Sequence, residues 1–257
     1  MPKKELGQHW LKDREILSSI ADAADLSAND TVLEIGPGLG TLTSELLRRA
    51  GRVVAVEFDR DLANKLPGQF PGKNLEVVSA DILSYDLSAL PSGYKVVANV
   101  PYYITSKIVE MLMTAANKPS QVVLLVQKEV AERLAAGPGD MSMLSVSAQV
   151  YAEVSLGPIV RAEYFTPPPK VDSRVVILHI RPVSFVEKDL EKRFFRLVKA
   201  GFSARRKKLS SSLAGGLMIS KPRAIDLLGG VNIDPNLRAQ DLSLEQWLDL
   251  TKVSPQQ

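Results

Sequence analysis

The chain has 257 residues but contains no cysteine and only two histidines, His9 and His179. The absence of cysteine excludes disulfide bonds, thiolate zinc sites and a cysteine nucleophile, and it is compatible with a cytosolic protein. So few histidines argue against a histidine metal site and against a Ser-His-Asp triad. We therefore expect no bound metal.

The chain also lacks any apolar run that approaches the roughly 20 residues of a membrane-spanning helix. Residues 1–5 lack the apolar stretch of a secretory signal and are too acidic for a typical transit peptide. We expect a cytoplasmic protein that does not engage a membrane. Hydrophobic residues make up 45% of the sequence, which suffices for a sizeable core.

Positive charge is scarce in most of the chain and concentrated at its end. Residues 1–180 carry 18 Lys/Arg and 21 Asp/Glu, a net charge of −3, whereas residues 181–257 carry 14 and 8, a net charge of +6. A mildly acidic body with a basic tail is typical of a protein that grips a polyanion at one end. An ordinary solvated surface with uneven charge remains the alternative.

Short apolar runs alternate with helical segments over the first half of the chain. This pattern predicts a mostly parallel sheet with helices on both faces, in the α/β class. The predicted strands are Thr31–Ile35, Arg52–Glu57, Leu75–Val78, Lys95–Ala98, Gln121–Val126, Val154–Val160 and Arg174–Ile180. The predicted helices are Leu17–Leu26, Leu39–Ala50, Asp59–Leu66, Ile104–Ala115 and one from about Lys128.

The strands stop near residue 182, so we predict one domain over residues 1–182 and a small helical domain over residues 183–257. Residues 187–213 and 221–250 are predicted helices. Met143–Tyr151 fits a helix or a strand, and we favour a helix. Thr166 and the three prolines after it must form a loop.

A glycine-rich loop joins the first predicted strand to the first helix that follows it. It contains Gly36, Gly38 and Gly40, and Glu34 lies two residues before the first of these glycines. Such a loop lets the backbone turn sharply and a ligand approach closely, although a dinucleotide site or a packing turn could also use it. Its Gly-x-Gly-x-Gly spacing differs from the dinucleotide fingerprint and is more usual for S-adenosylmethionine (SAM).

Four successive strands end in polar side chains, namely Glu34, Glu57, Asp81 and Asn99. In an open α/β sheet the ligand crevice lies outside the carboxyl ends of the strands, so these groups should share one rim. Glu57 can accept from both ribose hydroxyls of SAM, and Asp81 can accept from its adenine amine. The glycine loop would then pass around the methionine moiety.

The corner Asn99-Val100-Pro101-Tyr102 suits a reaction at the exocyclic amine of a base. That nitrogen is a poor nucleophile because its lone pair is delocalised into the ring. The Asn99 amide oxygen and the Val100 or Pro101 carbonyl could accept its two N–H bonds and so favour a localised lone pair. Pro101 fixes the turn and Tyr102 offers a stacking face. An Asx-type turn before a helix is the structural alternative.

With these residues, the chain resembles the rRNA adenine N6,N6-dimethyltransferases from end to end. The similarity covers the glycine loop, Glu57, Asp81 and the Asn99 corner. It also covers residues 6–11, where His9-Trp10 stands in place of the usual Asn-Phe or His-Phe, and the segments 127–133, 165–173 and 202–208. The resemblance implies a Rossmann-like, SAM-dependent methyltransferase domain with a seven-stranded sheet and a C-terminal helical rRNA-binding domain.

The resemblance also assigns residues to roles. His9, Leu11, Gly36, Glu57, Asp81 and Asn99 would contact SAM, together with the rest of the glycine loop, including Glu34, Gly38 and Gly40. Asn99, Pro101 and Tyr102 would hold the target adenine. Phe165 would stack on its other side, and the three prolines beside it favour a surface position.

The implied function is dimethylation of two adjacent adenosines in a loop near the 3′ end of small-subunit rRNA, on an assembling ribosomal particle. No heptad or apolar stripe in the sequence requires a dimer, so we expect a monomer. Unstacked loop bases can be splayed out and held between aromatic rings. A large-subunit rRNA adenine methyltransferase and a non-catalytic ribosome-assembly factor that keeps the fold remain alternatives.

The basic tail offers the RNA contacts. Lys199–Leu213 is predicted as one helix that carries Arg205, Arg206, Lys207 and Lys208, although contiguous cations on a helix cannot all face one row of phosphates. Lys3, Lys4, Lys12 and Arg14 would add a basic N-terminal segment. A solvated helix end is the alternative.

Overall fold

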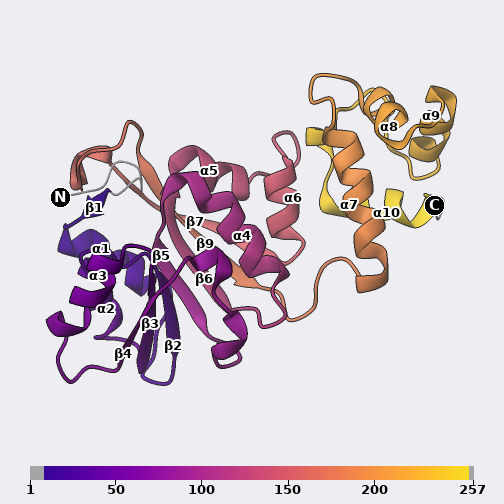
Figure 1. The fold of residues 1–257 in the computed structure, drawn as a ribbon. Helices are drawn as coiled ribbons and strands as arrows, with labels where there is room; N and C mark the ends of the chain where they lie inside the picture. The colour runs from indigo at the N-terminus through magenta and orange to yellow at the C-terminus, as the bar shows by residue number, and fades with distance from the viewer. Residues whose placement is uncertain (1–8, 255–257) are drawn as a thin grey trace. The chain divides into compact units, whose positions relative to one another are not determined.

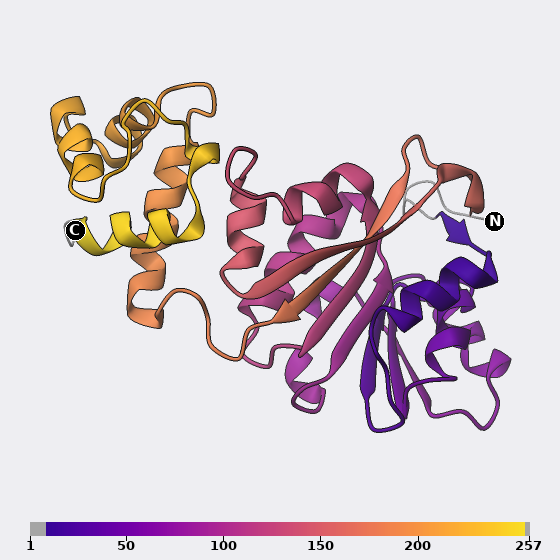
Figure 2. The same ribbon diagram turned by 180° about the vertical axis from the view of Figure 1, so that it is seen from behind.

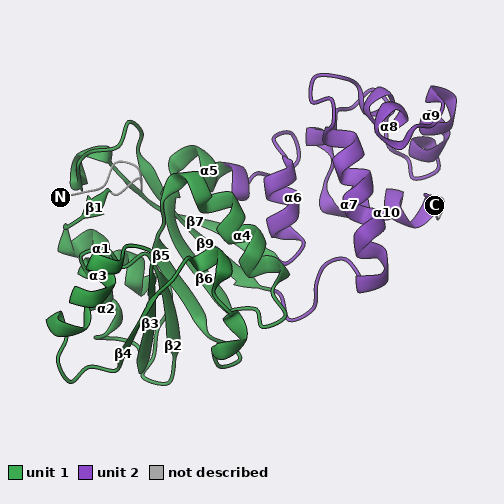
Figure 3. Ribbon diagram, in the orientation of Figure 1, with its two compact units in different colours: residues 1–132, 152–180 green, residues 133–151, 181–257 purple. Residues whose placement is uncertain are grey.

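A computed structural model describes residues 9–254, which form two compact units. Unit 1 comprises residues up to Glu132 together with Ala152–Ile180, and unit 2 comprises Arg133–Tyr151 and the chain from Arg181 onward (Figure 3). The chain passes from unit 1 to unit 2 for the last time between residues 180 and 181, close to the boundary expected near residue 182. Residues 133–151, which the sequence analysis placed in the first domain, are part of unit 2. The residues Lys3 and Lys4 and the segment 6–8 lie outside the described residues.

Unit 1 is built on a seven-stranded sheet of strand order β4-β3-β2-β5-β6-β9-β7 (Figure 1). The first five strands along the chain pair in parallel, and β9 runs antiparallel to both β6 and β7. All seven predicted strands are present, within two residues of the expected ends: β2 Thr31–Ile35, β3 Arg52–Glu57, β4 Leu75–Ser79, β5 Lys95–Asn99, β6 Gln121–Gln127, β7 Ala152–Val160 and β9 Ser173–Ile180.

Helices cover both faces of this sheet because its central strands are apolar on both sides. One face packs against the apolar sides of two helices, through Leu17, Ile20, Leu42 and Leu46. The other face is covered by helices that lie toward the viewer in Figure 1 and behind the sheet in Figure 2. The helices of unit 1 are α1 Arg14–Asp22, α2 Thr41–Leu46, α3 Arg60–Lys65, α4 Thr105–Thr114 and α5 Lys128–Leu134, the last of which reaches into unit 2.

A second sheet of only two short strands was not predicted. Strand β1, Trp10–Leu11, pairs antiparallel with β8, Phe165–Thr166. Each strand has two residues, too few to show an alternation in the sequence. The pair ties the N-terminal segment to the loop that precedes β9.

Besides the end of α5 and one 3₁₀ turn, unit 2 contains five α-helices in the described residues, α6 Met143–Gln149, α7 Lys188–Phe202, α8 Leu209–Leu217, α9 Lys221–Gly229 and α10 Leu244–Val253. The helix favoured for 143–151 is confirmed. The single helices predicted for 187–213 and 221–250 are wrong, because each is broken into two. The second break begins at the pair Gly229-Gly230, and Asn232 follows with a φ of 58°.

The basic run therefore does not lie on a helix. Helix α7 ends at Phe202, and Arg205, Arg206 and Lys207 form an exposed turn that Lys208 closes as the N-cap of α8. We call residues 205–208 the basic turn. Within the turn, the Lys207 N–H donates to the Ala204 carbonyl at 2.8 Å. The Lys208 ammonium donates to the Asn236 side chain at 2.7 Å.

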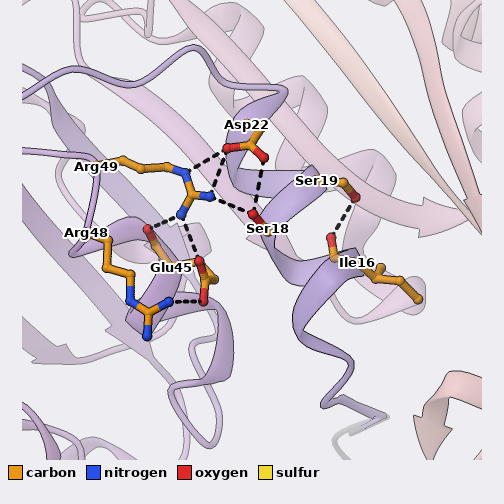
Figure 4. Close-up of polar contacts among 7 residues, drawn as sticks. All are labelled: Ile16, Ser18, Ser19, Asp22, Glu45, Arg48 and Arg49. Atoms are coloured by element: carbon orange, nitrogen blue, oxygen red, sulfur yellow. Dashed lines mark hydrogen bonds and ion pairs between the residues drawn. The ribbon is translucent and has the colours of Figure 1, made fainter.

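A polar network fastens α1 to the end of α2 (Figure 4). The Arg49 guanidinium donates to Asp22 and Ser18 of α1, at 2.8 and 2.7 Å, and to the Glu45 carbonyl and carboxylate, at 2.9 and 2.8 Å. Arg48 makes one hydrogen bond, to Glu45 at 3.0 Å, and its side chain is 60% exposed. Of the two arginines, Arg49 is thus the one that hydrogen-bonds to both helices.

Replacing Arg49 with Met should lower the free energy of unfolding by about 1–3 kcal/mol, because it leaves the mostly buried Glu45 carboxylate with a poorer partner and removes the bonds to α1. The matched change Arg48→Met should cost less than about 0.5 kcal/mol, since exposed ion pairs contribute little. Urea denaturation of both variants measures the difference. Equal losses would contradict the linking role of Arg49.

Candidate active site

The strand order places a crevice at the carboxyl ends of β2 and β5. These strands are neighbours in the sheet, but the chain runs outward from them in opposite directions, to β3 and to β6. Such a reversal opens the ligand crevice of an α/β sheet. A cavity of about 220 Å³ lies here, lined by residues that follow β2, β3, β4 and β5 and by the N-terminal strand β1.

The cavity brings together most of the residues singled out from the sequence. The polar strand ends Glu34, Glu57, Asp81 and Asn99 all line it, as the shared rim requires. The other predicted site residues among its walls are His9, Leu11, Gly36, Gly38, Pro101 and Tyr102. Gly40 and Phe165 are not among the lining residues.

Glu57 organises the glycine loop. Its two carboxylate oxygens accept from the Gly38 N–H at 3.0 Å and from the Asp59 N–H at 2.8 Å. Burial raises the pKa of Glu57, and these backbone hydrogen bonds oppose the rise. A carboxylate has about four acceptor positions, so Glu57 can still accept from a hydroxyl group of a ligand.

Gly36 leaves room for a ligand, whereas a Cβ at Gly38 would lie 3.7 Å from the Trp10 ring and Gly40 serves packing. Both Gly36 and Gly38 have positive φ, and a Cβ at Gly36 would meet nothing within 4 Å. A Cβ at Gly40 would come within 2.7 Å of Leu66 and 3.0 Å of Phe70. Gly40 therefore faces the side chains of the α3 region, and its contact with the cofactor stays a prediction.

Glu34 is enclosed in the protein. It is 1% exposed and its Oε2 atom has no hydrogen-bond partner among the described residues. Burial raises the pKa of Glu34 to about 8, and the nearby Glu57 charge adds to the rise. A carboxyl group in this environment is largely protonated at neutral pH.

Asp81 differs from Glu34 because it is exposed. One of its oxygens accepts from the Leu83 N–H at 3.0 Å, which begins a short 3₁₀ turn, Ile82–Ser84. The other oxygen is left to accept from a ligand at the cavity edge.

The Asn99 corner is oriented by the N-terminal segment. The Asn99 amide nitrogen donates to the His9 carbonyl at 3.4 Å, which leaves the amide oxygen as an acceptor. The Pro101 carbonyl already accepts from the Ile104 N–H at 3.3 Å and from the Thr105 hydroxyl at 3.4 Å. Of the two main-chain acceptors considered from the sequence, Val100 is thus the better placed to accept a second N–H.

The N-terminal segment is itself held against the corner. The His9 ring stacks on the Tyr102 ring, with centroids 5.9 Å apart and planes at 19°. Its Nδ1 atom lies 2.7 Å from the Pro167 carbonyl oxygen. The Thr41 hydroxyl donates to the Leu11 carbonyl at 2.9 Å. These contacts join residues far apart in the sequence, so no local pattern could predict them.

Phe165 does not lie where the sequence analysis placed it. It is 3% exposed and packs in the core with residues of α1 and of the sheet. The surface position was inferred from the neighbouring prolines, but Phe165 belongs to β8, whose pairing turns it inward and leaves Thr166 exposed. The surface position predicted for Phe165 is therefore wrong, whereas its stacking on a target base stays a prediction.

Apolar side chains at the cavity were missed from the sequence. Phe58 is 62% exposed and Tyr103 is 65% exposed, and both line the cavity, as does Leu83. Large exposed aromatic rings beside a cavity are suited to stacking on a flat ligand. The signal available was position, since Phe58 directly follows Glu57 and Tyr103 directly follows Tyr102. Within residues 9–254, no group of three or more His, Asp or Glu side chains is arranged to hold a metal ion.

The buried Glu34 carboxyl predicts how stability depends on pH. Its pKa is raised in the folded state, so folding is favoured while both states hold the proton, and this contribution is lost as pH rises from about 4.5 to about 8. Glu34→Gln removes the titrating group. The melting temperature of the variant relative to the unaltered protein should therefore rise between pH 5 and pH 8, roughly.

The exposed residue Glu110 offers a matched control for this measurement. Glu110→Gln should follow the unaltered protein across the same pH range. If the melting temperature of Glu34→Gln had the same pH dependence as those of the unaltered protein and Glu110→Gln, Glu34 would be ionised in the folded protein across this range.

Comparison with known proteins places these features in a family. A "Ribosomal RNA small subunit methyltransferase A" from Dehalococcoides mccartyi (strain CBDB1) is 46% identical over 96% of this chain and 87% of its own length. A protein of the same name from Moorella thermoacetica is 40% identical over 98% and 92%.

Solved structures agree over nearly the whole chain. A dimethyladenosine transferase from Plasmodium falciparum has a TM-score of 0.81 at 28% identity, covering 94% of this chain and 96% of its own. The 23S rRNA methyltransferase ErmE has a TM-score of 0.79 at 30% identity, covering 95% and 98%. The family model described as ribosomal RNA adenine dimethylase matches residues 2–255, and this chain belongs to that family.

Proposed function

We propose that the protein uses SAM to dimethylate N6 of two adjacent adenosines in a loop near the 3′ end of small-subunit rRNA. The observation that carries this proposal is a single cavity lined both by the carboxylates that suit a nucleoside and by the Asn99 corner that suits an amine. The small-subunit substrate is supported by the relatives named for it, at 40% and 46% identity. On this basis we also propose an assembling particle as substrate, a monomer, and action in the cytoplasm.

The residues present fit SAM. Glu57 and Asp81 supply acceptors for ribose hydroxyls and an adenine amine, and the space beside Gly36 admits a chain close to the backbone. Phe58 and Leu83 supply apolar surface for the adenine ring. When bound, SAM supplies an electrophilic methyl group on a sulfonium.

The Asn99 corner would prepare the amine for attack. The Asn99 amide oxygen and the Val100 carbonyl accept its two N–H bonds, which favours a pyramidal nitrogen with a localised lone pair. Tyr102 holds the plane of the base by stacking. Once the nitrogen carries the methyl group it is cationic and releases its proton to solvent, so this step requires no side-chain base.

Asn99→Ala should abolish methylation while the protein remains folded, because it removes the acceptor that acts in the transition state. The loss expected is at least about 100-fold in kcat. The measurement is mass mapping of rRNA after incubation of small-subunit particles with labelled SAM. Asn74→Ala is the matched control, since it removes a similar amide-to-carbonyl hydrogen bond, to Gly51, outside the cavity.

The same mapping, repeated with large-subunit rRNA as substrate in a parallel incubation, separates the alternatives. Label on large-subunit rRNA would favour an enzyme of the ErmE kind. Binding of SAM with no label on either RNA would favour a non-catalytic assembly factor.

We also propose the basic turn as an RNA contact. Arg205→Gln combined with Arg206→Gln should weaken RNA binding and flatten its dependence on salt, because fewer counterions are released, while affinity for SAM is unchanged. Lys208 is a poorer choice than the sequence suggested, because its ammonium bonds to Asn236. The charge-matched control changes the exposed residues Lys65 and Lys73 to Gln. An unaltered salt slope in the Arg205/Arg206 variant would exclude the basic turn.

A further inference from the structure

Ser173 is a buried hydroxyl at a fixed point next to the active site. It is the first residue of β9 and is 0% exposed. Its backbone is opposite Gln127 of β6 on one side and Val160 of β7 on the other. A residue paired on both edges cannot shift without disturbing two strands, so its hydroxyl group has a defined position.

That hydroxyl contacts Tyr102. The two side-chain oxygens are 2.7 Å apart, and either can donate the hydrogen. Burial raises the pKa of the Tyr102 phenol, so the group stays neutral and available for this bond. The bond joins residues 71 positions apart and connects the Asn99 corner directly to the sheet.

The backbone around Tyr102 sets where its side chain begins but does not fix the orientation of the ring. Tyr102 begins a short 3₁₀ turn, Tyr102–Ile104, and neither this turn nor the following helix α4 has a side-chain N-cap. A Tyr ring has two side-chain torsions to fix. Stacking on His9 restrains the tilt of the ring plane, while the hydroxyl bond fixes where its far end lies.

We infer that Ser173 is a positioning residue for methyl transfer, which acts by holding the Tyr102 ring in the orientation on which the target base stacks. This inference rests on the proposed function. A base that can tilt spends less time with its amine aligned to the Asn99 and Val100 acceptors, so the loss of the bond lowers the rate of the bound complex. Binding of SAM does not depend on it.

The test compares Ser173→Ala, Tyr102→Phe and the variant with both changes. Each removes the same hydrogen bond from a different side, and Tyr102→Phe keeps the stacking ring. We expect each single change to lower kcat about tenfold, with KM and Kd for SAM unchanged. The double variant should be no slower than the slower single variant, because the bond can be lost only once. Ser173→Thr, which restores a hydroxyl, should recover most of the rate.

Ser145→Ala is the matched control, since Ser145 is also 0% exposed and hydrogen-bonded but lies in helix α6 of unit 2. It should lower the melting temperature and leave kcat unchanged. If Ser173→Ala fails to fold, the inference is tested by Tyr102→Phe alone. A kcat for Tyr102→Phe equal to that of the unaltered protein overturns the inference. Independent, multiplicative losses in the double variant also overturn it. Absence of methylation by the unaltered protein would instead overturn the proposed function.

Discussion

The side-by-side pairing of β2 and β5 is the constraint on which the active site depends. Because the strands are parallel and in register from Val32 and Lys95, the glycine loop after one and the Asn99 corner after the other emerge next to each other. Glu57, from the strand on the far side of β2, then fixes the glycine loop through Gly38. The groups that suit the methyl donor and those that suit its acceptor thus come from adjoining strands, and the distance between them is set by the sheet.

The sequence was sufficient for the sheet because its strands are short, apolar and separated by helices. It was also sufficient for the shared rim, since Glu34, Glu57 and Asn99 lie within one residue of the ends of their strands and Asp81 follows β4 by two residues. It was insufficient wherever the partner lies far along the chain. The β1–β8 pair, the contact of His9 with Pro167 and the bond between Tyr102 and Ser173 leave no periodic signal, and the burial of Phe165 follows from the first of them.

Unit 2 illustrates the limit for helices. Apolar spacing correctly located helical chain from residue 187 onward, but it could not locate the basic turn, where the helix is interrupted. Close packing explains why the interruption is tolerated. A Cβ at Gly201 would come within 2.4 Å of Trp247, and one at Gly216 within 2.6 Å of Ala200. Helices α7, α8 and α10 therefore approach through glycines and keep their arrangement without one continuous helix.

The interleaving of the two units has a consequence for how the protein can be dissected. The backbone passes between the units at residues 132–133, 151–152 and 180–181, so Arg133–Tyr151 is an excursion out of unit 1 that later returns to it. Helix α6 packs against α7, and Gly139 and Met141 both donate to the Gln240 carbonyl. A protease cut after residue 181 would break the backbone before residues 182–257, but the contacts with residues 133–151 would still hold that part of unit 2 in place. A protein truncated after residue 181 would keep α6 but lose the helices that bury it. Neither unit can therefore be separated from the other by a single truncation.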